Sequence, residues 1–87
     1  MQNLEENIDA IDKEVANRIY RARSILGMSR LSLAKAVGVS HQQVAKYESG
    51  DNRVTTGRLV AIAKKLQKPL EYFYADLSGW GGQLNHK

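Results

Sequence analysis

Cysteine is missing from this chain, while proline, aromatic residues and long apolar runs are scarce. The lack of cysteine excludes a disulfide framework and any thiolate metal site. The longest apolar run is far too short to cross a membrane as a helix. No low-complexity tract or repeat divides the chain, so its 87 residues are expected to form one domain. At this size, close to the smallest that folds alone, the domain must be held together by apolar packing.

Signals for secretion and for catalysis are also missing. The first fourteen residues are acidic and lack the apolar segment of a signal peptide, so we expect a cytoplasmic protein. The two histidines, His41 and His86, lie far apart, and the sequence has no glycine-rich phosphate loop and no spaced set of metal ligands. We therefore expect that the protein is not an enzyme and that it binds no metal and no cofactor.

Charge is distributed unevenly along the chain. The net charge is +4 overall, but residues 15–68 hold eleven Lys or Arg against two acidic residues, a sum of +9. Residues 1–14 sum to −4 and residues 69–87 to −1. A basic body in a small domain favours a polyanionic partner, usually nucleic acid, over a surface that is merely solvated.

A helical stripe of apolar residues marks the first predicted helix, and the alternation typical of strands is nearly absent. Five apolar residues, the last of them Leu26, step by four, four, three and four residues along this stripe. Asp9 or Asp12 can cap the start of the helix, and Gly27 can end it. A helix over residues 10–26 is therefore predicted, with its apolar side turned inward.

Start and stop signals predict four further helices. Serine or threonine caps can begin three of them, and the one proline suits the first position of a short fifth helix. The expected fold is all-α, a compact five-helix domain over residues 10–76, between an acidic N-terminal extension (1–9) and a C-terminal tail (77–87). The predicted starts of the four later helices are Ser29, Ser40, Thr55 or Thr56, and Pro69.

The turn Gly38-Val39-Ser40 is the only separation between the second and third predicted helices. Such a short connection makes two helices cross steeply, as in a helix-turn-helix unit. Ala34 is small where the third helix must approach the second, and Val39 can fill the gap between them. Buried side chains on both helices would fix the crossing angle and leave the start of the third helix protruding. These side chains are Leu33, Val37, Val44 and Tyr47.

The stretch "GMSRLSLAKAVGVSHQQVAKYESGDNR" resembles the helix-turn-helix of the XRE family, the lambda-repressor and Cro-like DNA-binding domains. The flanking stretches "VANRIYRARSILG" and "TTGRLVAIAKKLQKPLEYFY" resemble the other helices of that family, so the likeness covers about residues 12–75. Its most specific parts are Gly38-Val39-Ser40, Tyr47-Glu48-x-Gly50 and the apolar spacing. The resemblance implies a five-helix domain that binds double-stranded operator DNA, usually as a homodimer on a palindrome.

The resemblance also implies which residues read bases and which grip the backbone. Residues at the start of the third helix face the major groove, where Gln can bond adenine and His can donate to a purine N7. His41, Gln42 and Lys46 are the predicted base-reading residues. Arg58 either joins the phosphate-binding set or is simply solvated, and the lysines of the fourth helix and its end are expected to be solvated. The predicted phosphate-binding residues are Ser29, Arg30, Gln43, Ser49, Asn52 and Arg53.

One charged position departs from the family pattern, and one charged pair follows it. The family commonly has Gln at the first position of the second helix, where this chain has Arg30. Arginine can still hold a phosphate, but the contact that the family's Gln makes with the third helix is left open. Arg23 and Glu48 occupy positions that pair in the resembling family, and we expect a buried ion pair between them.

A second class of function competes with DNA regulation. Helix-turn-helix domains of this family also occur in antitoxins, which bind a protein partner as well as DNA, and a fold does not fix a function. The apolar residues near the C-terminus are candidates for contacts with a second copy or a foreign protein, although Trp80 could instead fold back on its own domain. These candidate dimer contacts are Tyr72, Tyr74, Leu77 and Trp80.

Overall fold

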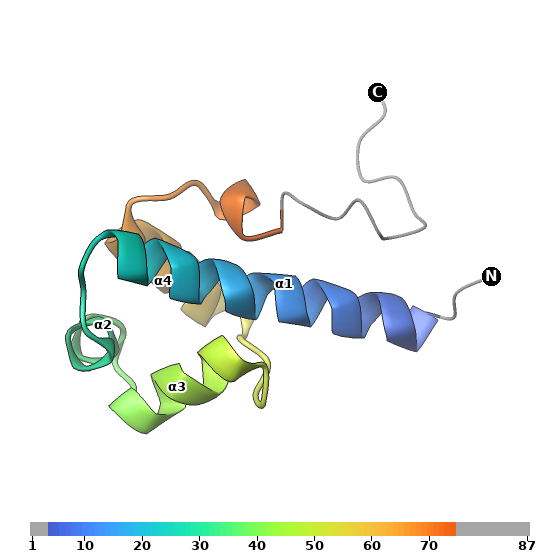
Figure 1. Cartoon of the computed structure of the whole chain (residues 1–87), viewed down its shortest axis with the longest axis horizontal. Helices are drawn as coiled ribbons and strands as arrows, with labels where there is room; N and C mark the ends of the chain where they lie inside the picture. The colour runs from blue at the N-terminus through green and yellow to red at the C-terminus, as the bar shows by residue number, and fades with distance from the viewer. Residues whose placement is uncertain (1–3, 75–87) are drawn as a thin grey trace.

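The computed structural model describes residues 4–74 of the chain, with side chains from residue 9 onward. Four α-helices and a final 3-10 helix account for this part of the chain, and residues 4–74 hold no strand. In Figure 1, α1 crosses the molecule with α2 and α3 below it, while η1 lies above. No helix in this range is both long and apolar enough to cross a membrane. The elements are α1 (Leu4–Ile25), α2 (Arg30–Val37), α3 (His41–Ser49), α4 (Thr56–Leu66) and η1 (Leu70–Tyr74).

The predicted all-α class is confirmed, but the fifth helix is not an α-helix. η1 is a 3-10 helix of five residues, and the Tyr72 N–H donates to the carbonyl of Pro69 three residues earlier, at 3.0 Å. A segment this short, rich in aromatic residues and opened by a residue without an N–H, gains little from the i to i+4 bonds of an α-helix.

The first helix starts earlier and stops slightly sooner than its apolar stripe indicated. α1 begins at Leu4, so neither Asp9 nor Asp12 caps it, and residues 4–9 belong to the helix rather than to an extension outside it. Apolar spacing shows only which part of a helix is buried. An acidic stretch can continue the helix beyond the core, because negative residues are favoured at the positive end of the helix dipole.

Gly27 ends α1 as expected, and the same turn exposes Leu26. Gly27 has φ +73°, its N–H donates to the carbonyl of Ser24 at 3.0 Å, and the N–H of Met28 donates to the carbonyl of Arg23 at 3.1 Å. These two bonds form a Schellman motif. The prediction that Leu26 turns inward is wrong, because the chain leaves the helical path there and the Leu26 side chain is exposed.

Local caps fix the starts of the next three helices. The side chains of Ser29, Ser40 and Thr55 accept hydrogen bonds from backbone N–H groups three residues later, at 3.0, 3.1 and 3.2 Å. Thr55, not Thr56, is therefore the cap of α4. Each such cap stabilises its helix by about 1 kcal/mol relative to alanine.

The core lies between α1 and the other elements. α1 packs against α3 and η1, and α2 packs against α3 and α4. Burying a large apolar side chain completely contributes about 1.5–3 kcal/mol, so six such residues supply much of the stability. The largest fully buried side chains are Phe73, Ile19, Leu33, Ile62, Leu66 and Val44.

The turn between α2 and α3 has the geometry of a helix-turn-helix. Gly38 takes the left-handed conformation at φ +80°, and the N–H groups of Gly38 and Val39 both donate to the carbonyl of Ala34, at 2.9 and 3.1 Å. Ala34 is buried where the helices meet, and Val39 packs against the core. The buried Val44 and Tyr47 hold the inner side of α3, so its first residues are left to face outward.

Candidate nucleic-acid interface

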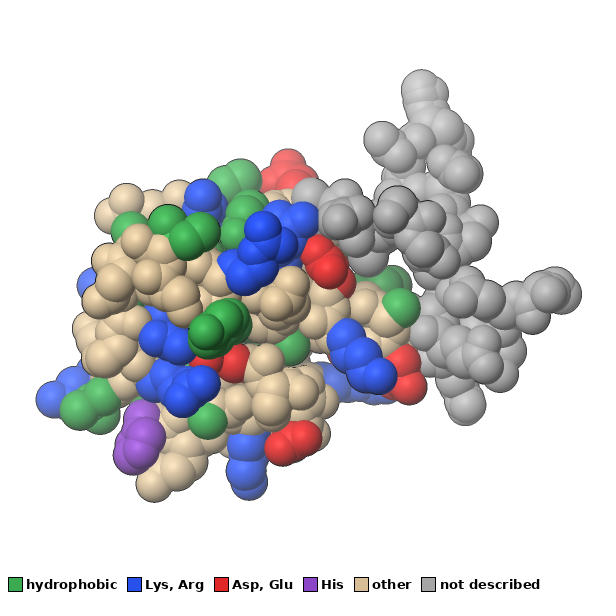
Figure 2. All heavy atoms as spheres, in the orientation of Figure 1, with side chains coloured by type: hydrophobic (Ala, Val, Ile, Leu, Met, Phe, Trp, Pro, Cys, Tyr) green, Lys and Arg blue, Asp and Glu red, His purple; other side chains and the backbone are tan. Residues whose placement is uncertain are grey.

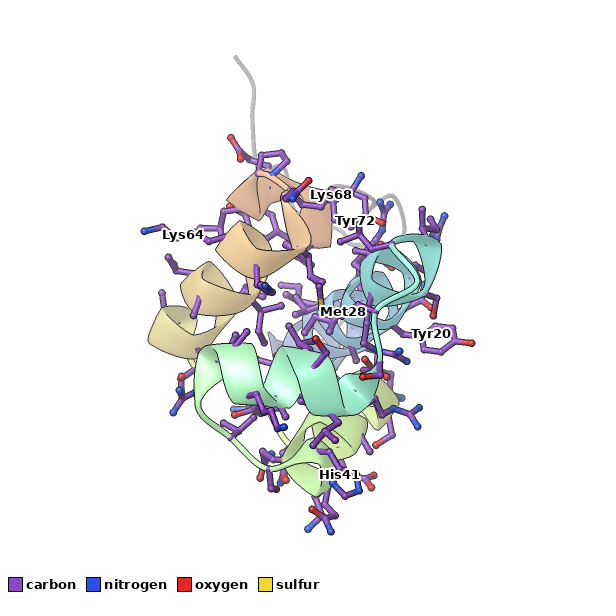
Figure 3. The ribbon with its side chains drawn as sticks, turned by 90° about the vertical axis from the view of Figure 1, so that its left-hand side faces the viewer. Tyr20, Met28, His41, Lys64, Lys68 and Tyr72 are labelled. Atoms are coloured by element: carbon purple, nitrogen blue, oxygen red, sulfur yellow. The ribbon has the colours of Figure 1, made fainter. Side chains whose placement is uncertain are left out.

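The recognition helix candidate, α3, presents three polar side chains to solvent. Ser40 caps the helix, and His41, Gln42 and Lys46 are all exposed. Figure 3 shows His41 at one end of the molecule, far from Lys68 and Tyr72 at the other. In Figure 2 His41, the one histidine within residues 9–74, lies at the lower left with Lys and Arg side chains directly above it. The predicted base-reading residues are therefore all exposed on α3, with His41 and Gln42 at its start and Lys46 in its last turn.

Gln43 connects α3 to the loop that follows it. Its side chain is half-buried, and its Nε2 donates to Oδ1 of Asn52 at 3.2 Å. Ser49 Oγ donates to the carbonyl of Lys46 and accepts from the N–H of Asp51, at 3.2 and 3.3 Å. Three of the predicted phosphate-binding residues thus form hydrogen bonds that hold the loop beside α3. A loop held in this way can contact the DNA backbone at a fixed distance from the bases.

Arg53, the last residue of the predicted phosphate-binding set, forms an ion pair with the first helix. Its Nε lies 2.7 Å from Oδ2 of Asp12, and the Arg53 side chain remains largely exposed. A surface pair of this kind is worth about 0–1 kcal/mol. Arg53 can therefore exchange Asp12 for a stronger anionic partner at little cost.

A cluster of three charged residues joins α1, α2 and α3. The Glu48 carboxylate accepts from Arg23 Nε at 2.6 Å and from Arg23 Nη2 at 3.1 Å, and Arg30 Nε donates to it at 2.9 Å. Arg23 also donates through Nη1 to the carbonyl of Met28 at 2.7 Å. The structure therefore brings the two residues of the expected ion pair together and adds Arg30 to them.

Arg58 has a partner that neither sequence interpretation named. Its Nη1 donates to the carbonyl of Val37, the last residue of α2. A positive charge at a helix C-terminus is favourable because the carbonyls there are the negative end of the dipole. Arg58 is half-buried in this position, so it braces the helix-turn-helix from α4 and is not simply solvated.

Tyr72, a candidate for dimer contacts, is engaged within its own domain. Its ring lies between two cations, with Arg18 Cζ 4.9 Å and Lys68 Nζ 4.8 Å from the centroid. Glu14 forms a hydrogen bond with Arg18 and raises the pKa of that guanidinium above its ordinary value. Lys68, expected to be solvated, is half-buried here. Tyr74 is also half-buried, and the other two candidates, Leu77 and Trp80, lie outside the described residues.

Sequence reasoning missed the contacts that charged side chains make across the fold. Asp12 was predicted only as a helix cap, and the contact of Arg30 with the third helix, left open by the sequence, is made to Glu48. No spacing rule links Arg53 to Asp12 or Arg30 to Glu48, because each pair lies on elements that meet only in the folded domain. The one signal in the sequence is that the basic body holds eleven Lys or Arg and only two acidic residues, so each carboxylate has several possible partners.

Comparison of the sequence with known proteins shows the family to which the chain belongs. The family model described as Helix-turn-helix matches residues 19–73, which include α2, α3 and α4. An "Uncharacterized transcriptional regulator in ATPase CF(0) region" of Rhodospirillum rubrum is 43% identical over 70 residues, covering 80% of this chain and 65% of that protein. An uncharacterized HTH-type transcriptional regulator of Rickettsia conorii is also 43% identical over 70 residues, covering 80% of this chain and 56% of its own length.

A more distant relative carries the same kind of name. The HTH-type transcriptional regulator DicA of Escherichia coli is 40% identical over 53 residues, covering 61% of this chain and 39% of that protein. This chain thus spans less than two thirds of the length of the relatives it matches. The match extends over both helices of the turn and over the elements that brace them, and the chain is a member of the XRE-type helix-turn-helix family.

Proposed function

We propose that this domain is a sequence-specific DNA-binding regulator of transcription, and that it acts as a repressor. The observation that carries the proposal is the exposed surface of α3, with Lys46 in its last turn and His41 and Gln42 at its start. Side chains at this end of a recognition helix reach base edges in the major groove. A repressor needs no more than this, since occupying an operator denies the site to other proteins.

Residues on both sides of α3 supply backbone contacts in this proposal. Ser29 and Arg30 lie at the start of α2, Ser49 is the last residue of α3, and Asn52 and Arg53 lie in the loop beyond it. Phosphate contacts from two sides position a recognition helix without reading sequence. The relatives that are named transcriptional regulators support the same function.

The domain is proposed to bind as a homodimer, because one short recognition helix covers too few base pairs for specificity alone. We expect selection from a random DNA pool to yield an inverted repeat with half-site centres about 34–36 Å apart, one turn of DNA. Footprinting at saturating protein should protect both halves. A single isolated half-site in both experiments would contradict dimeric binding.

The C-terminal tail, residues 77–87, is proposed to support the dimer. Deleting it should weaken dimerisation more than it lowers the melting temperature, because Leu77 and Trp80 are apolar residues in a glycine-rich sequence that follows the described domain. Sedimentation equilibrium of the full and shortened chains would measure this difference. An unchanged dimer constant would show that the tail is dispensable for self-association and would turn attention to a foreign protein partner.

A further inference from the structure

One carboxylate, that of Glu48, accepts hydrogen bonds from two arginines whose side chains differ in exposure. The Glu48 side chain is 2% exposed, that of Arg23 is 11% exposed and that of Arg30 is 46% exposed. Arg23 binds Glu48 through two nitrogens and the carbonyl of Met28 through the third. Each nitrogen of the Arg23 guanidinium therefore has a partner within the protein, and Arg23 compensates the buried charge of Glu48.

Arg30 differs in how it uses its guanidinium. Only Nε is bound, at 2.9 Å from Oε1 of Glu48. Within the part of the chain whose side chains are described, no hydrogen bond engages Nη1 or Nη2 of Arg30. The cluster holds two positive charges against one negative charge, and the excess lies on its exposed member. An anion that binds there would find two nitrogens of one planar group, Nη1 and Nη2, with their N–H donors available.

The position of Arg30 identifies the kind of anion. Arg30 is the first residue of α2, directly after the cap Ser29, and α2 packs against the recognition helix α3. The positive end of a helix dipole favours phosphate. A phosphate of DNA bound along α3 is the anion that this surface would meet if the function proposed above is correct.

We propose that Glu48 is a positioning residue for DNA binding, an inference that rests on the proposed function. By holding Nε of Arg30, the carboxylate fixes the guanidinium before DNA arrives, and Nη1 and Nη2 then bind one backbone phosphate. A side chain fixed in advance loses less conformational freedom on binding. Glu48 therefore strengthens binding to an anion although it is itself negative.

If Glu48 merely competed with phosphate for Arg30, removing its charge would strengthen DNA binding instead of weakening it. A double-mutant cycle separates the two cases, using Glu48→Gln, Arg30→Ala, both together and the wild type. The probe is a fluorescein-labelled random-sequence duplex, because phosphate contacts also act in non-specific binding. Titrations are run at a temperature where circular dichroism shows all four proteins folded.

We expect Glu48→Gln to weaken DNA binding by about tenfold in the wild-type background, since residues of one ion-pair network couple to this extent. In the Arg30→Ala background the same change should have little effect. Equal losses in both backgrounds would show a purely structural role and overturn the inference. Tighter binding by Glu48→Gln would show competition and overturn it as well.

Arg30→Lys tests the inference without disturbing the Arg23–Glu48 pair. Lysine keeps the charge, so the salt dependence of binding should be unchanged, but it loses the planar group that Glu48 orients. We expect affinity to fall by about tenfold, whereas Arg21→Lys, at an exposed position of α1, should bind like the wild type. Wild-type affinity in Arg30→Lys would overturn the inference.

Nuclear magnetic resonance separates failure of this inference from failure of the proposed function. In DNA-free protein the Arg30 Nε–H should exchange slowly with solvent, and Arg30→Lys should leave the Arg23 Nε–H signal in place. Rapid exchange of the Arg30 Nε–H would overturn the positioning role even if the protein binds DNA. If the wild type binds no duplex at all, the proposed function is wrong and the inference falls with it.

Discussion

Replacing Glu48 by glutamine should lower the free energy of unfolding by about 3–5 kcal/mol, the cost of removing one partner from a buried ion pair. The substitution leaves the guanidinium of Arg23 almost buried and opposite a neutral amide, with the second positive charge of Arg30 beside it. A small domain has only about 5–15 kcal/mol of stability, so this loss is a large share of the total. Thermal melting should shift down by roughly 12–40 °C.

Asp12→Asn is the matched control for Glu48→Gln. It also removes one carboxylate from an arginine, but both members of the Asp12–Arg53 pair keep access to water. We expect its stability to change by less than about 1 kcal/mol. Urea denaturation of both variants under one set of conditions would measure the difference. If Glu48→Gln unfolds at the same urea concentration as the wild type, the pair does not contribute as a buried charge.

Gln42→Ala should cost about 1–3 kcal/mol of binding free energy on the preferred DNA site. Gln42 is exposed at the start of α3, and the substitution leaves the core untouched, so the loss comes from a base contact. On random-sequence DNA the same variant should bind nearly like the wild type, because non-specific binding is almost entirely phosphate electrostatics. Two titrations, one on each duplex, would separate these effects.

Arg53→Ala is the counterpart of Gln42→Ala, because it removes a predicted contact with the DNA backbone instead of one with a base. It should weaken binding to both DNAs similarly and reduce the salt slope by about one counterion per domain. Asp12→Asn leaves Arg53 in place but removes its partner in the free protein. This variant should therefore bind both DNAs slightly more tightly than the wild type. If Gln42→Ala weakened both DNAs equally and Arg53→Ala altered only sequence preference, the two assigned roles would be reversed. If neither variant changed DNA binding, α3 would serve as a scaffold for another partner.

Much of the architecture follows from local signals in the sequence. The caps Ser29 and Ser40 and the left-handed Gly38 lie where the residue types predicted them, because each acts on backbone groups within a few residues. The alternation of buried and exposed positions along α3 was also predictable. That alternation exposes His41, Gln42 and Lys46, but their contact with bases remains a prediction.

Periodicity was a poorer guide to where elements begin and end. The apolar stripe of α1 marks its buried side, yet the helix extends back to Leu4 because an acidic stretch needs no core contact to remain helical. At the other end, Leu26 follows the spacing but lies beyond the last helical residue, so the turn at Gly27 directs it outward. Spacing describes a helix only for as long as the backbone stays helical.

Apart from the Arg23–Glu48 pair, which the family resemblance implied, the long-range partners of the charged residues were decided by the tertiary structure. The sequence determined that the body is basic and that its helices form a helix-turn-helix. It did not determine that Arg30 binds Glu48, that Arg53 binds Asp12 or that Arg58 caps α2. A long charged side chain can reach many groups and can also remain in water, so its partner is set by the few ångströms left between helices once the core has packed. Apolar patterning fixes that packing, and the packing then selects which arginines remain available to an anion.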